Sequence, residues 1–115
     1  MPKRGGAQVP SSEKLVDDRI TLLFKGILCL RTVDECYRFF EDLCTIREIK
    51  ALAERFRVAQ MLDDGFTYSE IAEETGASTA TISRVKRFLH YGADGYRLIL
   101  DRMRREGVLP PKSNP

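Results

Sequence analysis

The chain has 115 residues, of which 43% are apolar and 31% are charged, and its formal net charge is only +2. This length and composition predict one small globular domain. Charged residues interrupt every apolar stretch before it reaches the roughly 20 residues of a membrane-spanning helix, and no apolar segment follows residues 1–4 as a secretory signal requires. We therefore expect a cytoplasmic protein without a membrane partner.

Helical patterns fill the chain between its two ends. Residues 1–11 mix proline, glycine and charge without periodicity and predict a flexible N-terminal arm, and residues 108–115 predict a C-terminal tail. Between them, residues 12–107 predict an all-α domain, because no stretch alternates long enough to form a strand. The first helix is expected from an N-cap at Ser12 to about Leu30. Its apolar residues are spread so widely that we expect burial on more than one side.

Two capping boxes open the next two helices. Thr32–Glu35 and Thr45–Glu48 both place a threonine three residues before a glutamate, so that each side chain can bond the other residue's backbone amide. The first predicts a helix to about residue 43. The second predicts a longer helix that ends at Gly65, which can adopt the left-handed backbone of a C′ residue. In the earlier of these helices the residues expected to face inward are Tyr37, Phe40 and Leu43.

The last helix is expected to begin at an N-cap on Asp94 and to end at Gly107. Neither this helix nor the first is required by the core of one small helix-turn-helix unit. A core of this size stays thin unless it is shared. We therefore expect both helices to pack against a second subunit.

Residues 68–87, YSEIAEETGASTATISRVKR, predict a helix-turn-helix that spans about residues 67–91. A glycine at the turn can adopt a positive φ without a Cβ penalty, and Ser78 can cap the second helix. A small residue fits where the two helices cross. The expected core of this motif is Ile71, Ala72, Gly76, Ile82 and Val85. A generic pair of helices inside a bundle is the alternative interpretation.

The exposed face of the second helix favours DNA binding over that alternative. It carries small and hydroxyl residues near its start and then arginine, whereas a merely solvated face more often carries glutamate and lysine pairs. Arginine can bond guanine through two atoms, serine and threonine can meet bases or phosphates, and the helix N-terminus can bind a phosphate. The residues expected to contact double-stranded DNA are Ser78, Thr79, Ala80, Thr81, Ser83, Arg84, Lys86 and Arg87.

The low net charge conceals a division along the chain. Residues 31–75 carry a net charge of −5, and residues 76–115 carry +5. The helix-turn-helix crosses this boundary, with its acidic element first and its basic element second. Such a division can orient a protein on DNA despite a low total charge.

No pattern in the sequence predicts catalysis, a metal site or a cofactor. The chain has three cysteines, an odd number, and none is spaced as Cys-x-x-Cys. Because all three stand among apolar residues, we interpret Cys29, Cys36 and Cys44 as core thiols. His90 is the only histidine and has no neighbouring aspartate or cysteine in sequence. The pair at residues 63–64 is expected to be solvated at a helix end.

These motifs resemble the Trp repressor superfamily, and most of all its YerC/YecD-type branch. The resemblance covers about residues 20–105 and is most specific from 45 to 89, which contains LAERFRVAQML and SEIAEETGASTATISRVKRFL. The run Ala-Thr-Ile-Ser-Arg at 80–84 differs from that of the Trp repressor only at Ser83, where the repressor has threonine. The resemblance implies six helices per subunit in an intertwined homodimer, with one helix-turn-helix in each subunit.

The resemblance also implies a ligand pocket. In the Trp repressor, tryptophan lies between two arginines that match Arg55 and Arg84 here, and two threonines of that pocket match Thr45 and Thr81. If this pocket holds no tryptophan, Arg84 is left to contact DNA. Arg55 is then expected to pair with a carboxylate such as Glu48 or Glu54.

Two positions depart from the family's pocket. The family has a glycine directly after the second arginine and a serine three residues further on, where this chain has Val85 and Phe88. Overpacking costs about 1 to 3 kcal/mol, and loss of a polar partner costs a similar amount. We therefore expect an altered pocket that does not bind tryptophan usefully. The sequence leaves open whether another small-molecule co-repressor binds.

The leading hypothesis is a sequence-specific DNA-binding transcriptional regulator that represses. It would bind a palindromic operator as a homodimer, with half-sites about one helical turn apart. The alternative is a helical protein-interaction module that has lost specific DNA binding. In that case the acidic first element of the helix-turn-helix would dock a basic partner.

Overall fold

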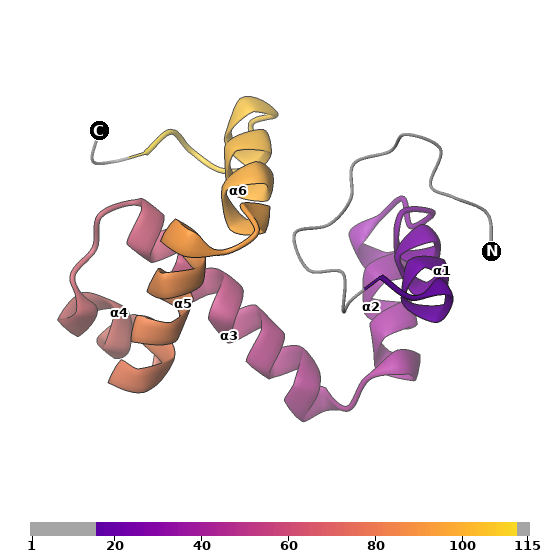
Figure 1. Cartoon of the computed structure of the whole chain (residues 1–115), viewed down its shortest axis with the longest axis horizontal. Helices are drawn as coiled ribbons and strands as arrows, with labels where there is room; N and C mark the ends of the chain where they lie inside the picture. The colour runs from indigo at the N-terminus through magenta and orange to yellow at the C-terminus, as the bar shows by residue number, and fades with distance from the viewer. Residues whose placement is uncertain (1–15, 113–115) are drawn as a thin grey trace. The chain divides into compact units, whose positions relative to one another are not determined.

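The structure is a computed structural model that describes residues 16–112 (Figure 1). Within this range it contains helices and no strand, which confirms the all-α class. The helices are α1 (Asp18–Ile27), α2 (Val33–Leu43), α3 (Ile46–Asp63), α4 (Tyr68–Thr75), α5 (Thr79–Tyr91) and α6 (Gly95–Arg105). They fall into two compact units: an N-terminal unit, which ends at Cys44 and holds α1 and α2, and a C-terminal unit with α3 to α6. None of the helices within the described range combines the length and apolar character needed to cross a bilayer.

The first helix is shorter than the sequence predicted. Its N-cap is Asp17, whose carboxylate accepts hydrogen bonds from the amides of Arg19 at 2.7 Å and Ile20 at 3.3 Å. The helix therefore begins at Asp18, and the predicted start at Ser12 is wrong because residues 16 and 17 precede the helix. Ser12 itself and the predicted arm, residues 1–11, lie outside the described residues. The helix also ends before residue 30, where the backbone tightens into i→i−3 hydrogen bonds.

The first predicted capping box, at Thr32 and Glu35, is formed only in part. The hydroxyl of Thr32 accepts from the amide of Glu35 at 3.1 Å, as expected. The carboxylate of Glu35 accepts instead from the amide of Arg31, at 2.8 Å. Both side chains therefore still bond a backbone amide at the start of α2. In a capping box, however, Glu35 would accept from the amide of Thr32, one residue after Arg31.

The N-terminal unit has no buried residue in either of its helices. In the single chain Tyr37 is 65% exposed and Leu43 is 48% exposed, so the prediction that they face inward is wrong there. Phe40 is half-buried, with its ring edge-on to Phe39 at 5.4 Å. Cys29 is exposed as well, which contradicts its interpretation as a core thiol. Two helices alone cannot cover both sides of their own apolar residues.

The C-terminal unit has a packed core. The capping box at Thr45 and Glu48 is present, with both hydrogen bonds formed at 3.1 and 2.8 Å. Gly65 has a φ of 91° just beyond α3, as expected for a C′ residue. The buried cluster that joins α3, α4, α5 and α6 consists of Val58, Ala59, Met61, Ile71, Ala77, Ile82, Val85 and Leu100.

An ion cluster ties the end of α6 to the end of α3. Arg104 donates a 2.6 Å hydrogen bond to Asp63, and Lys112 lies 3.2 Å from the other oxygen of that carboxylate. The side chain of Asp63 is only 7% exposed, so the prediction that it is solvated is wrong. Burial alone raises the pKa of Asp63, but the hydrogen bonds from Arg104 and Lys112 outweigh it and hold the pKa below 3.8.

The turn from α5 into α6 is closed differently from the prediction. Asp94 occupies the N-cap position but makes no capping hydrogen bond, because its backbone is left-handed with a φ of 65°. Arg97 fastens the turn instead, donating from Nε to the carbonyl of Leu89 at 3.1 Å. A second nitrogen of Arg97 lies 3.1 Å from Nδ1 of His90. A β-carbon at Gly92 would collide with the carbonyl oxygen of Phe88, so this turn needs glycine.

Candidate nucleic-acid interface

Helices α4 and α5 form a helix-turn-helix within the predicted span. Gly76 has a φ of 74° at the turn, and its amide donates to the carbonyl of Ala72 at 2.8 Å. Ser78 caps α5 by accepting from the amide of Thr81 at 3.1 Å. The turn therefore has the backbone that the Gly-Ala-Ser sequence predicted.

Two threonines that the sequence analysis did not single out complete this motif. Thr67 and Glu70 form a complete capping box, at 2.8 and 3.1 Å, which fixes the start of α4. Its Thr-x-x-Glu signal was present in the sequence. Thr75 donates its hydroxyl to the carbonyl of Ile71 at 2.7 Å and accepts from the amide of Ala77 at 3.1 Å. This second brace depends on the turn geometry and has no simple sequence signature.

The expected core residues of the motif lie where α4 and α5 meet α3. Ile71 and Ile82 are fully buried, and Val85 is 2% exposed. Ala72 is half-buried. Leu89, one turn further along α5, is also buried. One side of α5 is thus packed into the core of the C-terminal unit, and the other side is free to contact a ligand.

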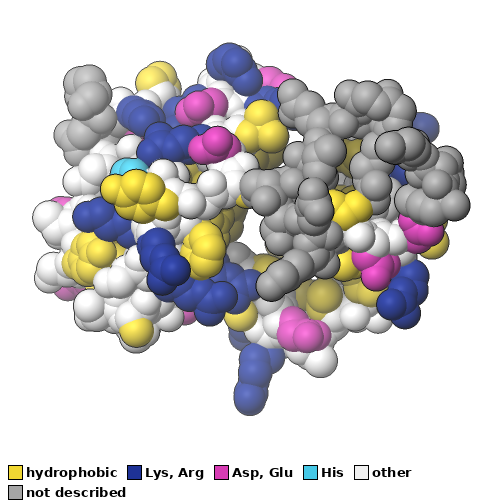
Figure 2. All heavy atoms as spheres, in the orientation of Figure 1, with side chains coloured by type: hydrophobic (Ala, Val, Ile, Leu, Met, Phe, Trp, Pro, Cys, Tyr) yellow, Lys and Arg dark blue, Asp and Glu magenta, His cyan; other side chains and the backbone are white. Residues whose placement is uncertain are grey.

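The residues expected at DNA lie on the free side of α5. Thr81 is half-buried, and the others are exposed: Ser78, Thr79, Ala80, Ser83, Arg84, Lys86 and Arg87. In Figure 2, Lys and Arg side chains gather over the part of the surface where α5 lies. No acidic residue occurs within α5. The face is therefore a basic ridge with small hydroxyl residues at its start.

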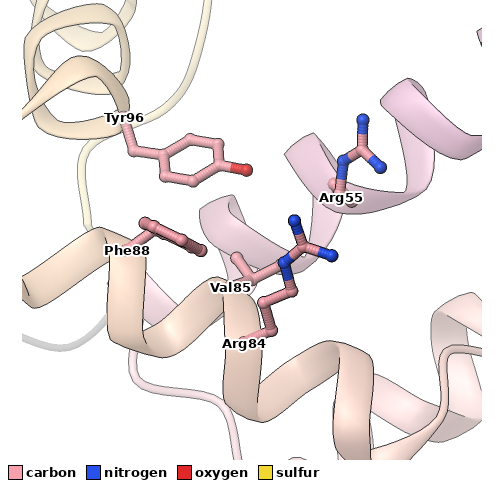
Figure 3. A pocket seen from close by; sticks show the side chains of 5 residues that line it. All are labelled: Arg55, Arg84, Val85, Phe88 and Tyr96. Carbon is pink, nitrogen blue, oxygen red and sulfur yellow. The ribbon is translucent and has the colours of Figure 1, made fainter. Parts of the chain in front are cut away.

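The two arginines matched to the family's ligand pocket line a cavity in this chain (Figure 3). The cavity measures about 240 Å³ and is lined by Arg55 of α3, Arg84, Val85 and Phe88 of α5, and Tyr96 of α6. Figure 3 shows the hydroxyl of Tyr96 directed toward the two guanidinium groups. The guanidinium carbon of Arg84 lies 5.9 Å from the centre of the Phe88 ring.

The pocket differs from the expectation in three ways. Val85 forms part of its wall and Phe88 stays 47% exposed, so the two larger side chains do not remove the space. Thr45 and Thr81 are not among the lining residues, and their hydroxyls bond the amide of Glu48 and the hydroxyl of Ser78.

The third difference concerns Arg55, which makes no ion pair within residues 16–112, so the expected pairing is wrong. Glu48 bonds the amide of Thr45 within its capping box. Glu54 is the next residue along the helix from Arg55, and adjacent residues of a helix do not face each other.

Within residues 16–112, no three histidine, cysteine, aspartate or glutamate side chains are placed to share a metal ion. The geometry provides a helix, α5, that is packed into the core on one side and is basic on the other. A tight turn at Gly76 connects it to α4. This arrangement places the chain in the class of helix-turn-helix DNA-binding proteins.

Comparison with known proteins agrees with this class. The chain matches the family model of the Trp repressor protein over residues 18–104. It is 58% identical over 92 residues to YerC, an uncharacterized protein of Bacillus subtilis (strain 168), covering 80% of this chain and 88% of YerC.

Two solved structures are also similar. A candidate Trp repressor from Staphylococcus aureus has a TM-score of 0.78 and 53% identity, covering 83% of this chain and 95% of that one. A TrpR-like protein from Eubacterium eligens ATCC 27750 has a TM-score of 0.78 and 54% identity, with 80% and 95% covered. The chain belongs to the Trp repressor family, whose members are helix-turn-helix regulators that bind DNA and act as dimers.

Proposed function

We propose that this protein is a transcriptional repressor that binds a palindromic operator as a homodimer and does not depend on tryptophan. The observation that carries the proposal is the two-sided character of α5. Ile82 and Val85 bury one side of the helix in the core, while the side chains of Arg84 and Arg87 stay exposed. A helix held in this way can enter the major groove without moving away from its support.

The residues of α5 suggest how the groove is read. Arg84 and Arg87 are placed one turn apart, so each can bond the O6 and N7 of a guanine. Ala80 allows close approach of the helix backbone to the bases. The amides at the start of α5, next to Ser78, can bind a phosphate. Phosphate contacts supply much of the affinity, so we expect binding to weaken strongly as salt increases.

The exposed apolar residues of the N-terminal unit support a homodimer. Leu22, Leu28 and Tyr37 are 69%, 84% and 65% exposed in the single chain. So much exposed apolar surface is unusual for a protein that acts as a monomer. A second copy related by a two-fold axis would cover these residues and set two copies of α5 on one palindrome. A regulator that binds genomic DNA is also expected to be cytoplasmic.

Independence from tryptophan is proposed on the chemistry of the cavity. Phe88 stands where the family has a serine, so a hydroxyl partner for the ligand is lost. The ring of Phe88 already lies near the Arg84 guanidinium, at 5.9 Å. We expect calorimetry to detect no binding of L-tryptophan at micromolar concentrations. Micromolar binding would contradict this part of the proposal and leave DNA binding intact.

The second candidate function is a protein-interaction module, and the acidic surface of α4 is the observation that favours it. Glu70, Glu73 and Glu74 are exposed on this helix, and only Glu74 has a basic partner, Arg57 at 3.4 Å. A basic protein could dock there. Replacement of Arg84 and Arg87 by alanine distinguishes the two functions, because it would abolish DNA binding and leave an α4-mediated interaction unchanged.

Selection from random DNA tests the proposal. The full chain is incubated with a pool of duplexes that carry a random central segment, and bound duplexes are recovered and sequenced over several rounds. We expect enrichment of a palindrome whose half-sites are about 10 base pairs apart, centre to centre. Failure to enrich any sequence at low salt would overturn the proposed function.

A further inference from the structure

Tyr68 joins the core of the C-terminal unit to the exposed face of α5. It is the first residue of α4, directly after the Thr67 capping box that fixes the start of that helix. Its side chain is half-buried and packs against the hydrophobic cluster. The ring therefore has a fixed position at the edge of the helix-turn-helix.

Two exposed residues of α5 contact this ring. The hydroxyl of Ser83 donates to the phenol oxygen of Tyr68 at 3.5 Å. The ammonium nitrogen of Lys86 lies 5.5 Å from the centre of the ring, within the range of a cation–π interaction. Ser83 and Lys86 are three residues apart, so they share the side of α5 that faces α4. One anchored side chain thus holds two of the groups that our proposal places at DNA.

Holding these groups in advance has a direct consequence for binding. A lysine side chain has many rotamers, and fixing it at a phosphate or base costs conformational entropy. When the ring already restricts Lys86, less of that entropy is lost as the complex forms. The same reasoning applies to the hydroxyl of Ser83, whose rotation is limited by its bond to Tyr68.

We propose that Tyr68 is a positioning residue of the DNA interface, which prepares Ser83 and Lys86 for contact. The inference rests on the proposed function and adds an α4 residue to a surface otherwise built from α5. It also predicts that two parts of the Tyr68 side chain act on different residues of α5. The phenol oxygen acts through Ser83, and the ring acts through Lys86.

Double-mutant cycles on DNA affinity test the proposal. The probe is the labelled duplex recovered by selection with the wild-type chain, and affinity is measured by fluorescence anisotropy. Tyr68→Phe keeps the ring and should weaken binding about 3-fold, the scale of one neutral hydrogen bond. The same change should have no effect in a Ser83→Ala background. Tyr68→Leu should weaken binding about 10-fold, since it removes both contacts, and about 3-fold in a Lys86→Gln background, where only the contact with Ser83 remains to be lost.

Two further measurements separate positioning from simple stabilisation. The ε-protons of Lys86 should show a ring-current shift in the NMR spectrum of the free wild type and of Tyr68→Phe, and lose it in Tyr68→Leu. Phe66→Leu is the matched control, because Phe66 is a partly exposed ring next to the same cap and, within residues 16–112, makes no cation–π contact with a residue of α5. It should leave DNA affinity unchanged. If Tyr68→Leu does not fold, Tyr68→Met replaces it.

The outcomes separate the two proposals. Strictly additive effects in both cycles, with wild-type binding intact, would overturn the role of Tyr68 and leave the proposed function standing. A loss of thermal stability in Tyr68→Leu without coupling to Lys86 in DNA affinity would do the same. A wild-type chain that selects no duplex would overturn both proposals.

Discussion

The two units of this chain solve the problem of a small core in opposite ways. All nine buried hydrophobic residues of the described chain lie in the C-terminal unit, and none lies in α1 or α2. The C-terminal unit packs four helices around its own core and fastens α6 to α3 with Asp63 and Arg104. The N-terminal unit leaves Leu22 and Leu28 uncovered. The C-terminal unit can therefore hold a recognition helix on its own core. The N-terminal unit needs an apolar partner surface to cover its leucines.

Under the proposed function, this difference lets a short chain serve two purposes. A recognition helix must keep a fixed orientation, so it is best built on a core that does not depend on assembly. A dimerisation surface must present apolar residues, which a self-contained core would hide. Separating the tasks lets each part be tested by substitutions that should leave the other intact.

The largest effect is expected from charge in the N-terminal unit. Leu22→Glu together with Leu28→Glu should weaken self-association by at least about 10,000-fold, because each leucine contributes roughly 1.5 to 3 kcal/mol on burial, a two-fold interface uses it twice, and about 1.4 kcal/mol corresponds to a tenfold change. Sedimentation velocity over a dilution series measures the effect. Arg38→Glu, on an exposed α2 side chain, is the control and should remain dimeric. A wild type that sediments as a monomer would contradict the account.

The next largest effect is expected on α5. Arg84→Ala together with Arg87→Ala should reduce affinity for the selected duplex about 100-fold or more, since a bidentate contact to a base is worth about 1 to 3 kcal/mol. Thermal stability should change little, because both side chains are exposed. Arg19→Ala with Arg38→Ala removes the same charge from the N-terminal unit and should cost far less affinity. Equal losses in the two double variants would show that net charge, rather than α5, governs binding.

A smaller effect is expected from the ion cluster of the C-terminal unit. Asp63→Asn should lower the free energy of unfolding by about 3 kcal/mol, because it leaves the buried Arg104 without its main partner. Urea denaturation measures this change. Asp101→Asn is the matched control: Asp101 lies 3.8 Å from the same guanidinium but is 62% exposed, so less than 1 kcal/mol is expected. Comparable losses would mean that the buried pair does not fasten α6.

The smallest effect is the pH dependence that Asp63 adds. Its pKa in the folded chain lies below 3.8, the ordinary value that applies in the unfolded chain. The unfolded state therefore binds the proton more tightly, and the stabilisation is complete well above pH 3.8 and is lost as pH falls through the folded pKa. Unfolding free energies at about pH 5 and pH 3 should diverge more in the wild type than in Asp63→Asn. Parallel curves would contradict the assignment.

Short-range features were predictable from the sequence because they depend on neighbouring residues. Gly76, Ser78 and the spacing of Ile82 and Val85 sufficed to locate the turn and the buried side of α5. The capping box at Thr45 could be found in the same way. Each of these uses a backbone preference or a helical period that operates over a few residues.

Long-range features could not be found in this way. The burial of Asp63 depends on Arg104, 41 residues away in the chain. The contact of Tyr68 with Ser83 depends on how α4 crosses α5, and the cavity beside Arg55 depends on three helices together. The predicted N-cap at Ser12 is wrong because the carboxylate of Asp17 caps α1 instead, five residues further along the chain.

Stoichiometry on full and half operators tests the central claim most directly. The wild-type chain is titrated onto the selected palindrome and onto a duplex with only one of its half-sites, and the complexes are weighed by sedimentation equilibrium. The account predicts two chains on the full palindrome and at least 100-fold weaker binding to the single half-site, because two copies of α5 act together. One chain per duplex, with both duplexes bound equally well, would contradict it.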